Sequence, residues 1–123
     1  MKISIITPTF NSQDTISDNI NSVISQKYTN WEQIIIDNKS TDSTISIIEQ
    51  FNNKKIKVIS EPDSGIYEAI NKGIKRANGD IISILHSDDF YYNEKVLFNI
   101  RSYFLKYKTD IIFGDLIYVS KKN

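Results

Sequence analysis

The fold is decided by residues 81–89, which read IISILHSDD and run from a short apolar segment straight into two adjacent carboxylates, Asp88 and Asp89. A short apolar run of this kind is typical of a strand that is buried on both faces of a parallel sheet. Two carboxylates at a strand end are costly unless a cation or hydrogen-bond donors accompany them. We therefore expect a positively charged group to bind at this position.

Four further apolar runs alternate with helical patterns along the chain. The expected strands are residues 3–7, closed by Pro8, then 33–37, 56–60, 81–85 and 110–113. The helical patterns between them begin after Asn11 or Ser12, after Asp42 or Ser43, after Gly65 and at residue 93. The apolar stripe expected on the first helix is Ile16, Ile20, Val23 and Ile24, and the residues expected to face inward on the last are Val96, Leu97, Ile100 and Phe104. This βαβαβαβαβ order predicts an α/β, Rossmann-like fold with right-handed crossovers, a mostly parallel sheet and helices on both faces.

The composition narrows the classes of protein that this chain can belong to. Its 123 residues fit a single domain, and its 15 basic and 15 acidic residues leave no net charge that would draw it to nucleic acid. The absence of cysteine excludes disulfides and thiolate metal sites. No segment approaches the roughly 20 apolar residues that a membrane span needs. We expect a cytoplasmic protein, with any membrane association either peripheral, at the inner face of the plasma membrane, or carried by sequence not present here.

Polar residues at the expected strand ends are the candidates for a ligand site, because ligands of parallel α/β sheets bind outside the carboxyl ends of the strands. These residues are Thr7 to Asn11, Asp37 to Asp42, Ser60 to Asp63, His86 to Asp89, and Gly114 with Asp115. No glycine-rich dinucleotide motif and no P-loop lysine is present, so a bound diphosphate would need Mn²⁺ or Mg²⁺ held by one or two carboxylates. In an extended segment Asp88 and Asp89 point to opposite faces and can divide the metal and a neighbouring hydroxyl between them.

Each candidate also has a purely structural explanation. Asp37 could be a turn or cap residue instead of a contact to a base, Asp63 is a turn former by default, and Asp42 is assigned to helix capping. His86, the only histidine, is interpreted as a packed or hydrogen-bonded residue at the strand end. Lys72 lies close enough to Asp63 in sequence to approach a diphosphate.

Five motifs in a fixed order resemble the N-terminal half of the family-2 glycosyltransferases. They are residues 4–11 (SIITPTFN), 31–42 (WEQIIIDNKSTD), 63–73 (DSGIYEAINKG), 77–80 (ANGD) and 87–89 (SDD). The resemblance runs through essentially the whole chain. It implies the GT-A fold, a nucleotide-sugar donor that we expect to be a UDP-sugar, and Mn²⁺ or Mg²⁺. It also implies transfer with inversion to a glycan or lipid-linked acceptor, as in members that build bacterial surface polysaccharides.

The resemblance assigns roles to individual residues. Pro8, Thr9, Phe10 and Asn11 would border the nucleoside, Asp37 would contact the base, and Asp63 would lie near the base or ribose. Asp88 would take a ribose hydroxyl and Asp89 would hold the metal, which makes these two the expected catalytic residues. The chain departs from the family pattern at Asn38, Lys39 and His86, where the family often has a second acidic residue, a glycine and an asparagine.

The family's C-terminal half supplies the acceptor site and the general base. We therefore expect residues 1–123 to form one nucleotide-sugar-binding domain that is cut short relative to a full transferase, lacks the general base and exposes a sheet edge that favours a homo-oligomer. Two other functions stay open: a non-catalytic remnant that binds nucleotide or a partner, and a receiver-type signalling domain. A receiver would carry its acid pair after the first strand and a lysine after the fifth, where this chain has Thr7-Pro8-Thr9 and Gly114-Asp115.

Overall fold

The computed structural model describes residues 1–107 and 111–112, which form one parallel sheet and its covering helices. The strands are β1 (Ile3–Thr9), β2 (Trp31–Asp37), β3 (Ile56–Ser60), β4 (Ile81–Ile84) and β5 (Ile111–Ile112). The helices are α1 (Ile16–Ile24), α2 (Thr44–Gln50), α3 (Ile66–Arg76) and α4 (Val96–Tyr107). The strand order is β3-β2-β1-β4-β5 and each neighbouring pair is parallel. The predicted α/β alternation is confirmed.

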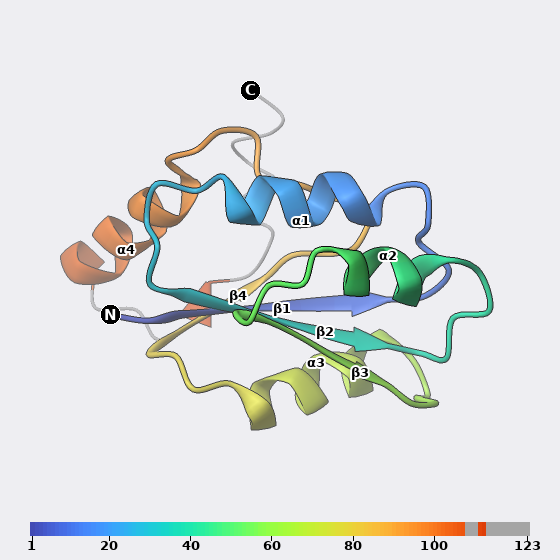
Figure 1. Cartoon of the computed structure of the whole chain (residues 1–123). Coiled ribbons are helices and arrows are strands. Elements are labelled where there is room, and N and C mark those ends of the chain that lie inside the picture. Colours follow the sequence, from blue (N-terminus) through green and yellow to red (C-terminus); the bar gives the residue numbers. More distant parts are fainter. Residues whose placement is uncertain (108–110, 113–123) are drawn as a thin grey trace.

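Helices cover both faces of the sheet, as the buried strands require. Figure 1 shows α1, α2 and α4 on one face and α3 on the other. Alternate residues of β2 serve the two faces, because successive side chains of a strand point in opposite directions. Ile34 and Ile36 pack with Ala69 of α3, whereas Ile35 packs with Ile20 of α1.

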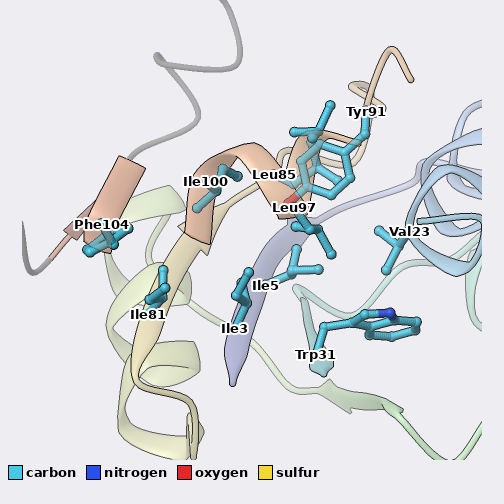
Figure 2. Close-up of a cluster of buried hydrophobic side chains, with 11 residues drawn as sticks. Ile3, Ile5, Val23, Trp31, Ile81, Leu85, Tyr91, Leu97, Ile100 and Phe104 are labelled. Carbon is cyan, nitrogen blue, oxygen red and sulfur yellow. The ribbon is translucent and has the colours of Figure 1, made fainter. Parts of the chain in front are cut away.

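The largest core cluster joins α4 to the strands β1 and β4. Figure 2 shows its side chains, which are Ile3, Ile5, Val23, Trp31, Ile81, Leu85, Tyr91, Val96, Leu97, Ile100 and Phe104. The four residues of α4 that were expected to face inward all belong to it. Ile24, also expected on the apolar stripe of the first helix, is 39% exposed instead.

The first strand does not end at Pro8, as the sequence analysis expected. β1 continues to Thr9, with Pro8 opposite Ile36 of β2. Ile6 accepts a hydrogen bond from Leu85 on the β4 side, and Pro8, two residues on, faces the same side. Because β4 has already ended at Ile84, the N–H that proline lacks is not needed there.

The first helix begins later than expected, and neither Asn11 nor Ser12 caps it. Its N-cap is Thr15, without a side-chain capping bond. Asn11 has a positive φ of 45°, and its side chain accepts from the Thr41 N–H. The Ser12 hydroxyl instead lies 2.7 Å from the Ser87 hydroxyl. Both side chains therefore join loops to each other.

Some expectations concern residues outside the described part of the chain. The fifth strand is described only at Ile111–Ile112, and Gly114, Asp115 and the residues after them lie beyond it. Within the described residues, no helix combines the length and the apolar character that crossing a bilayer requires.

Candidate nucleotide site

A cavity of about 670 Å³ opens at the carboxyl ends of β1 and β4. These strands flank the point at which the strand order reverses direction, since β1 leads on one side to β2 and on the other to β4. Open α/β sheets bind ligands at such a point because the loops diverge there. The lining residues are Pro8, Thr9, Phe10, Asn11, Ser12, Asp14, Thr15, Asn38, Asp63, Gly65, Ile66, Ala69, His86, Ser87 and Asp88.

The cavity is acidic. Asp14, Asp63 and Asp88 contribute to its lining, while lysine and arginine do not among the residues that the structure describes. Phe10 adds an apolar surface that is 55% exposed at the same place. An anionic ligand would meet repulsion here unless a cation entered with it.

Four of the residues expected to border a nucleoside do lie together. Pro8, Thr9, Phe10 and Asn11 all line the cavity, at the end of β1 and the start of the following loop. The loop is held in place from the β2 side, because the Asn11 N–H donates to the Ser40 hydroxyl at 2.8 Å.

Asp37 does not reach the cavity. It is fully buried at the end of β2, where its carboxylate accepts hydrogen bonds from the Ser40 N–H and the Ser60 hydroxyl, both at 2.8 Å. It thus ties the loop after β2 to the end of β3. The next residue, Asn38, is the one that lines the cavity.

Asp63 lies on the cavity wall with one carboxylate oxygen spare. Its backbone N–H donates to Asn38 Oδ1 at 2.9 Å, and its Oδ1 accepts from the Gly65 N–H at 3.0 Å. Its Oδ2 is buried and has no hydrogen-bond partner within the described residues. A buried carboxylate oxygen without a donor is costly, which makes Oδ2 a position where a ligand hydroxyl or N–H would be stabilising.

The two carboxylates of the acidic turn after β4 lie differently, although residues 87–88 form a turn and not the extended segment that was expected. Asp88 is exposed and lines the cavity, whereas Asp89 is half-buried and does not. The Asp89 N–H closes the turn by donating to the His86 carbonyl at 3.0 Å. His86 lines the cavity beside Ser87, which agrees with its interpretation as a residue at the strand end.

Lys72 is not brought to the cavity. Its ammonium lies 3.2 Å from Glu61 and 3.3 Å from Glu68, and it donates to the Pro62 carbonyl at 3.0 Å. Desolvation alone would lower the pKa of Lys72, but the two carboxylates outweigh it and raise the pKa above its ordinary value. The side chain therefore clamps the loop that carries Asp63 to α3.

Asp42 performs the role that was assigned to it at the start of the second helix. Ser43 occupies the N-cap position, but the carboxylate of Asp42 accepts from the Thr44 N–H at 2.9 Å and from the Gln13 N–H at 3.2 Å. Burial tends to raise the pKa of Asp42, and these hydrogen bonds together with the Thr44 hydroxyl lower it below its ordinary value.

No individual role was predicted from the sequence for two residues at or next to the cavity. Asn38 lines the cavity but entered only among the polar residues at the strand ends and as a departure from a family pattern. Asn19 of α1, whose side-chain amide donates to the His86 and Asp89 carbonyls, was not singled out. A signal for Asn19 exists in the sequence: it lies three residues after Ile16 and one before Ile20, so an amide stands on the apolar stripe of the helix.

No group of three or more His, Cys, Asp or Glu side chains that could hold a metal ion occurs within residues 1–107 and 111–112. The expected Mn²⁺ or Mg²⁺ would therefore have to share few protein ligands with phosphate oxygens and waters. That is the usual way in which Mg²⁺ binds together with a phosphorylated ligand. Asp88 places a carboxylate in the cavity lining, and Asp89 follows it on the same turn.

Residues 4–123 match the protein family described as Glycosyl transferase family 2. Over 114 residues the chain is 36% identical to the Escherichia coli UDP-Glc:alpha-D-GlcNAc-diphosphoundecaprenol beta-1,3-glucosyltransferase WfgD, covering 92% of this chain and 45% of that protein. It is 31% identical over 117 residues to the poly(ribitol-phosphate) beta-N-acetylglucosaminyltransferase TarS of Staphylococcus aureus, covering 91% of this chain and 20% of TarS. The chain spans less than half the length of the curated relatives it matches.

Solved structures agree with these sequence matches. Residues 1–349 of TarS in complex with UDP-GlcNAc superpose with a TM-score of 0.82 at 30% identity, over 89% of this chain and 33% of that one. A mannosyltransferase of Pyrobaculum calidifontis, in complex with GDP-Man and Mn²⁺, gives a TM-score of 0.78 at 23% identity, over 84% of this chain and 32% of that one, which shows a shared fold. The expected GT-A fold is confirmed.

Proposed function

The chain belongs to glycosyl transferase family 2, and we propose that it forms the donor-binding part of a transferase that takes a sugar from a nucleoside diphosphate. We propose a UDP-sugar as donor, which the UDP-GlcNAc complex of TarS supports. The proposed acceptor is a glycan or lipid-linked glycan, and the transfer inverts the anomeric carbon. Names of relatives such as WfgD and TarS favour bacterial surface polysaccharide synthesis.

One observation carries the proposal: Asp63 and Asp88, from loops that follow different strands, line one cavity where the strand order reverses. The spare Oδ2 of Asp63 suits a hydroxyl or N–H of a nucleoside. Asp88 is assigned to a ribose hydroxyl. The exposed ring of Phe10 offers an apolar surface beside them.

Donor binding in an acidic cavity needs a cation, and we assign Asp89, together with the donor's phosphate oxygens, to Mn²⁺ or Mg²⁺. When bound, the metal neutralises the charge that develops on the departing nucleoside diphosphate. The chain's own contribution is to place Asp88 and Asp89 side by side on a turn that is closed by a backbone hydrogen bond.

For the base contact we propose Asn38 in place of Asp37. Both carboxylate oxygens of Asp37 accept hydrogen bonds, from Ser40 in the loop after β2 and from Ser60 at the end of β3. Asn38 lines the cavity, and its Oδ1 is engaged by the Asp63 N–H, which leaves the amide Nδ2 to donate to a base carbonyl.

Calorimetric titration of the chain with UDP, GDP and dTDP, each in Mn²⁺ and in EDTA, tests the proposal. We expect UDP to bind at least tenfold more tightly with Mn²⁺ than with EDTA. Asp89→Asn should remove most of this gain, Asp88→Asn should remove less, and Asp18→Asn on the exposed face of α1 serves as the matched control. Equal UDP affinity in Mn²⁺ and EDTA would contradict the metal assignment. Failure of all three nucleotides to bind would contradict donor binding and favour a non-catalytic remnant that binds a partner.

A further inference from the structure

Asn19 is a fully buried amide on α1 that reaches under the acidic turn. Its Nδ2 donates to the His86 carbonyl at 2.9 Å and to the Asp89 carbonyl at 3.0 Å, so one side chain holds both ends of the turn. The His86 carbonyl also accepts the Asp89 N–H that closes the turn. Asn19 thereby fixes the backbone from which the carboxylates of Asp88 and Asp89 project.

A second buried amide fixes the orientation of Asn19. Gln33 of β2 donates from its Nε2 to Asn19 Oδ1 and to Thr7 Oγ1, both at 2.9 Å. Because Asn19 Oδ1 is occupied in this way, its Nδ2 must face the two carbonyls. Gln33 and Thr7 are fully buried as well, so the network runs inside the core from β1 to the turn.

Burial of the Asn19 amide costs desolvation free energy, and packing in the core gives no reason for an amide at this position. Ile16 and Ile20 of the same helix face the core, and an apolar residue between them would bury surface without any need for partners. The hydrogen bonds with Gln33 and with the turn offset the free-energy cost of removing the Asn19 amide from water. Among the residues that the structure describes, both hydrogen bonds donated by the Asn19 side chain go to the acidic turn.

We propose that Asn19 is a positioning residue for the acidic turn, which sets the direction of the Asp88 and Asp89 carboxylates toward a metal-bound diphosphate. The inference rests on the proposed function for the presence of that ligand. It assigns to α1 a part in donor binding, although Asn19 itself does not line the cavity.

A second buried amide near the end of α1 supplies a matched control for Asn19. Gln26, two residues beyond the end of α1, is also buried and also holds backbone: its Nε2 donates to the Asn93 carbonyl at 2.6 Å, and its Oε1 accepts from the Leu97 N–H at 3.0 Å. It anchors the segment that leads into α4 and does not touch the acidic turn. Loss of either amide should reduce stability, but only loss of Asn19 should loosen the turn.

The test compares Asn19→Leu with Gln26→Leu in two measurements on the 123-residue chain. By calorimetry, the gain in UDP affinity from Mn²⁺ over EDTA should fall at least tenfold in Asn19→Leu and stay within twofold of the parent in Gln26→Leu. By NMR hydrogen exchange, the Asp89 amide should exchange at least tenfold faster in Asn19→Leu only. If Asn19→Leu shows no cooperative thermal transition, Asn19→Ser, which cannot span both carbonyls, takes its place under the same criteria.

The outcomes separate the two proposals. A parent chain without Mn²⁺-dependent UDP binding contradicts the proposed function, and the exchange rates then decide the positioning role alone. Equal loss of the metal-dependent gain in both variants, or unchanged exchange at Asp89 in the Asn19 variant, would overturn the role of Asn19.

Discussion

At the scale of single residues, Asp37 and Asn38 at the end of β2 are adjacent and polar but differ in burial and in what they contact. Asp37 is fully buried and holds Ser40 and Ser60, while Asn38 lines the cavity. A strand end places successive side chains on opposite sides, so only one of the two can face a ligand.

We predict that substitution of Asp37 mainly lowers folding stability, whereas substitution of Asn38 mainly lowers UDP affinity. Asp37→Asn should lower the free energy of unfolding by about 1–3 kcal/mol, because hydrogen bonds to a buried charged group are weakened. Asn38→Ala should weaken UDP by about three- to tenfold with a smaller loss of stability. Urea unfolding and calorimetry on both variants check this. If Asp37→Asn keeps the parent's stability and loses more UDP affinity than Asn38→Ala, the base contact belongs to Asp37.

Glu32 is a buried carboxylate at the opposite end of the sheet from the cavity. Its Oε2 accepts from the Ser4 hydroxyl and the Asn78 N–H, both at 2.6 Å, and its Oε1 lies 3.2 Å from Lys57 and 3.7 Å from Lys2. Burial raises the pKa of Glu32, but these partners together lower it below its ordinary value. The charged form is therefore the one that the fold stabilises.

Stability should depend on pH through Glu32. Because its pKa is lower in the folded chain, its contribution is complete above the ordinary value of 4.5 and is lost as the pH falls through the folded pKa. Glu32→Gln should cost about 1.5–3 kcal/mol at pH 7, and this difference from the parent should shrink below pH 4.5. Urea unfolding across pH measures it, with exposed Glu49→Gln as control. A difference that stays constant from pH 7 to pH 3.5 would refute the assignment.

At the scale of elements, α3 packs close to β1 because Gly73 faces the sheet. A Cβ at Gly73 would stand 2.4 Å from Cγ2 of Ile6, which is fully buried. The glycine thus sets the depth at which α3 packs, and α3 follows directly on the loop that carries Asp63.

Gly73→Ala should destabilise the chain by about 1–3 kcal/mol, since the overlap with Ile6 outweighs the better helix propensity of alanine. Lys75→Ala, exposed on the same helix, should change stability by less than about 0.5 kcal/mol. Thermal unfolding of the two variants measures the difference, and a Gly73→Ala chain as stable as the parent would show that α3 can move away from the sheet.

The elements themselves could be predicted from the sequence because long apolar runs and helical stripes are local signals. β3 and the inward face of α4 agree with prediction, since periodicity alone specifies them. The errors arise where tertiary contacts decide. Pro8 stays in β1 because β4 ends early, and Ser12 does not cap α1 because its hydroxyl is used by Ser87.

The candidate site was predictable as a set of strand ends and not as individual contacts. Residues 8–11, Asp63 and Asp88 meet in the cavity because parallel topology brings strand ends together. Asp37 and Lys72 do not line the cavity because they bind Ser60 at the end of β3 and Glu61 in the loop that follows it, and the sequence does not reveal these tertiary contacts.

At the scale of the whole molecule, the amino and carboxyl ends of the parallel strands differ in charge. At the amino ends Glu32 is paired with Lys2 and Lys57. At the carboxyl ends Asp63 and Asp88 line a cavity that lacks lysine and arginine in the described part of the chain. A cation and its diphosphate ligand should therefore bind at the carboxyl ends only.

Paramagnetic broadening of backbone amides by Mn²⁺ in the presence of UDP locates the bound cation, because Mn²⁺ broadens only nearby signals. Mg²⁺ with UDP gives the reference spectrum. We predict that the amides of residues 9–12 and 86–89 lose intensity at substoichiometric Mn²⁺, that those around Glu32 and Lys57 keep theirs, and that Asp89→Asn abolishes the effect. Broadening centred on Glu32, or equal broadening at both ends of the strands, would contradict cation binding at the carboxyl ends.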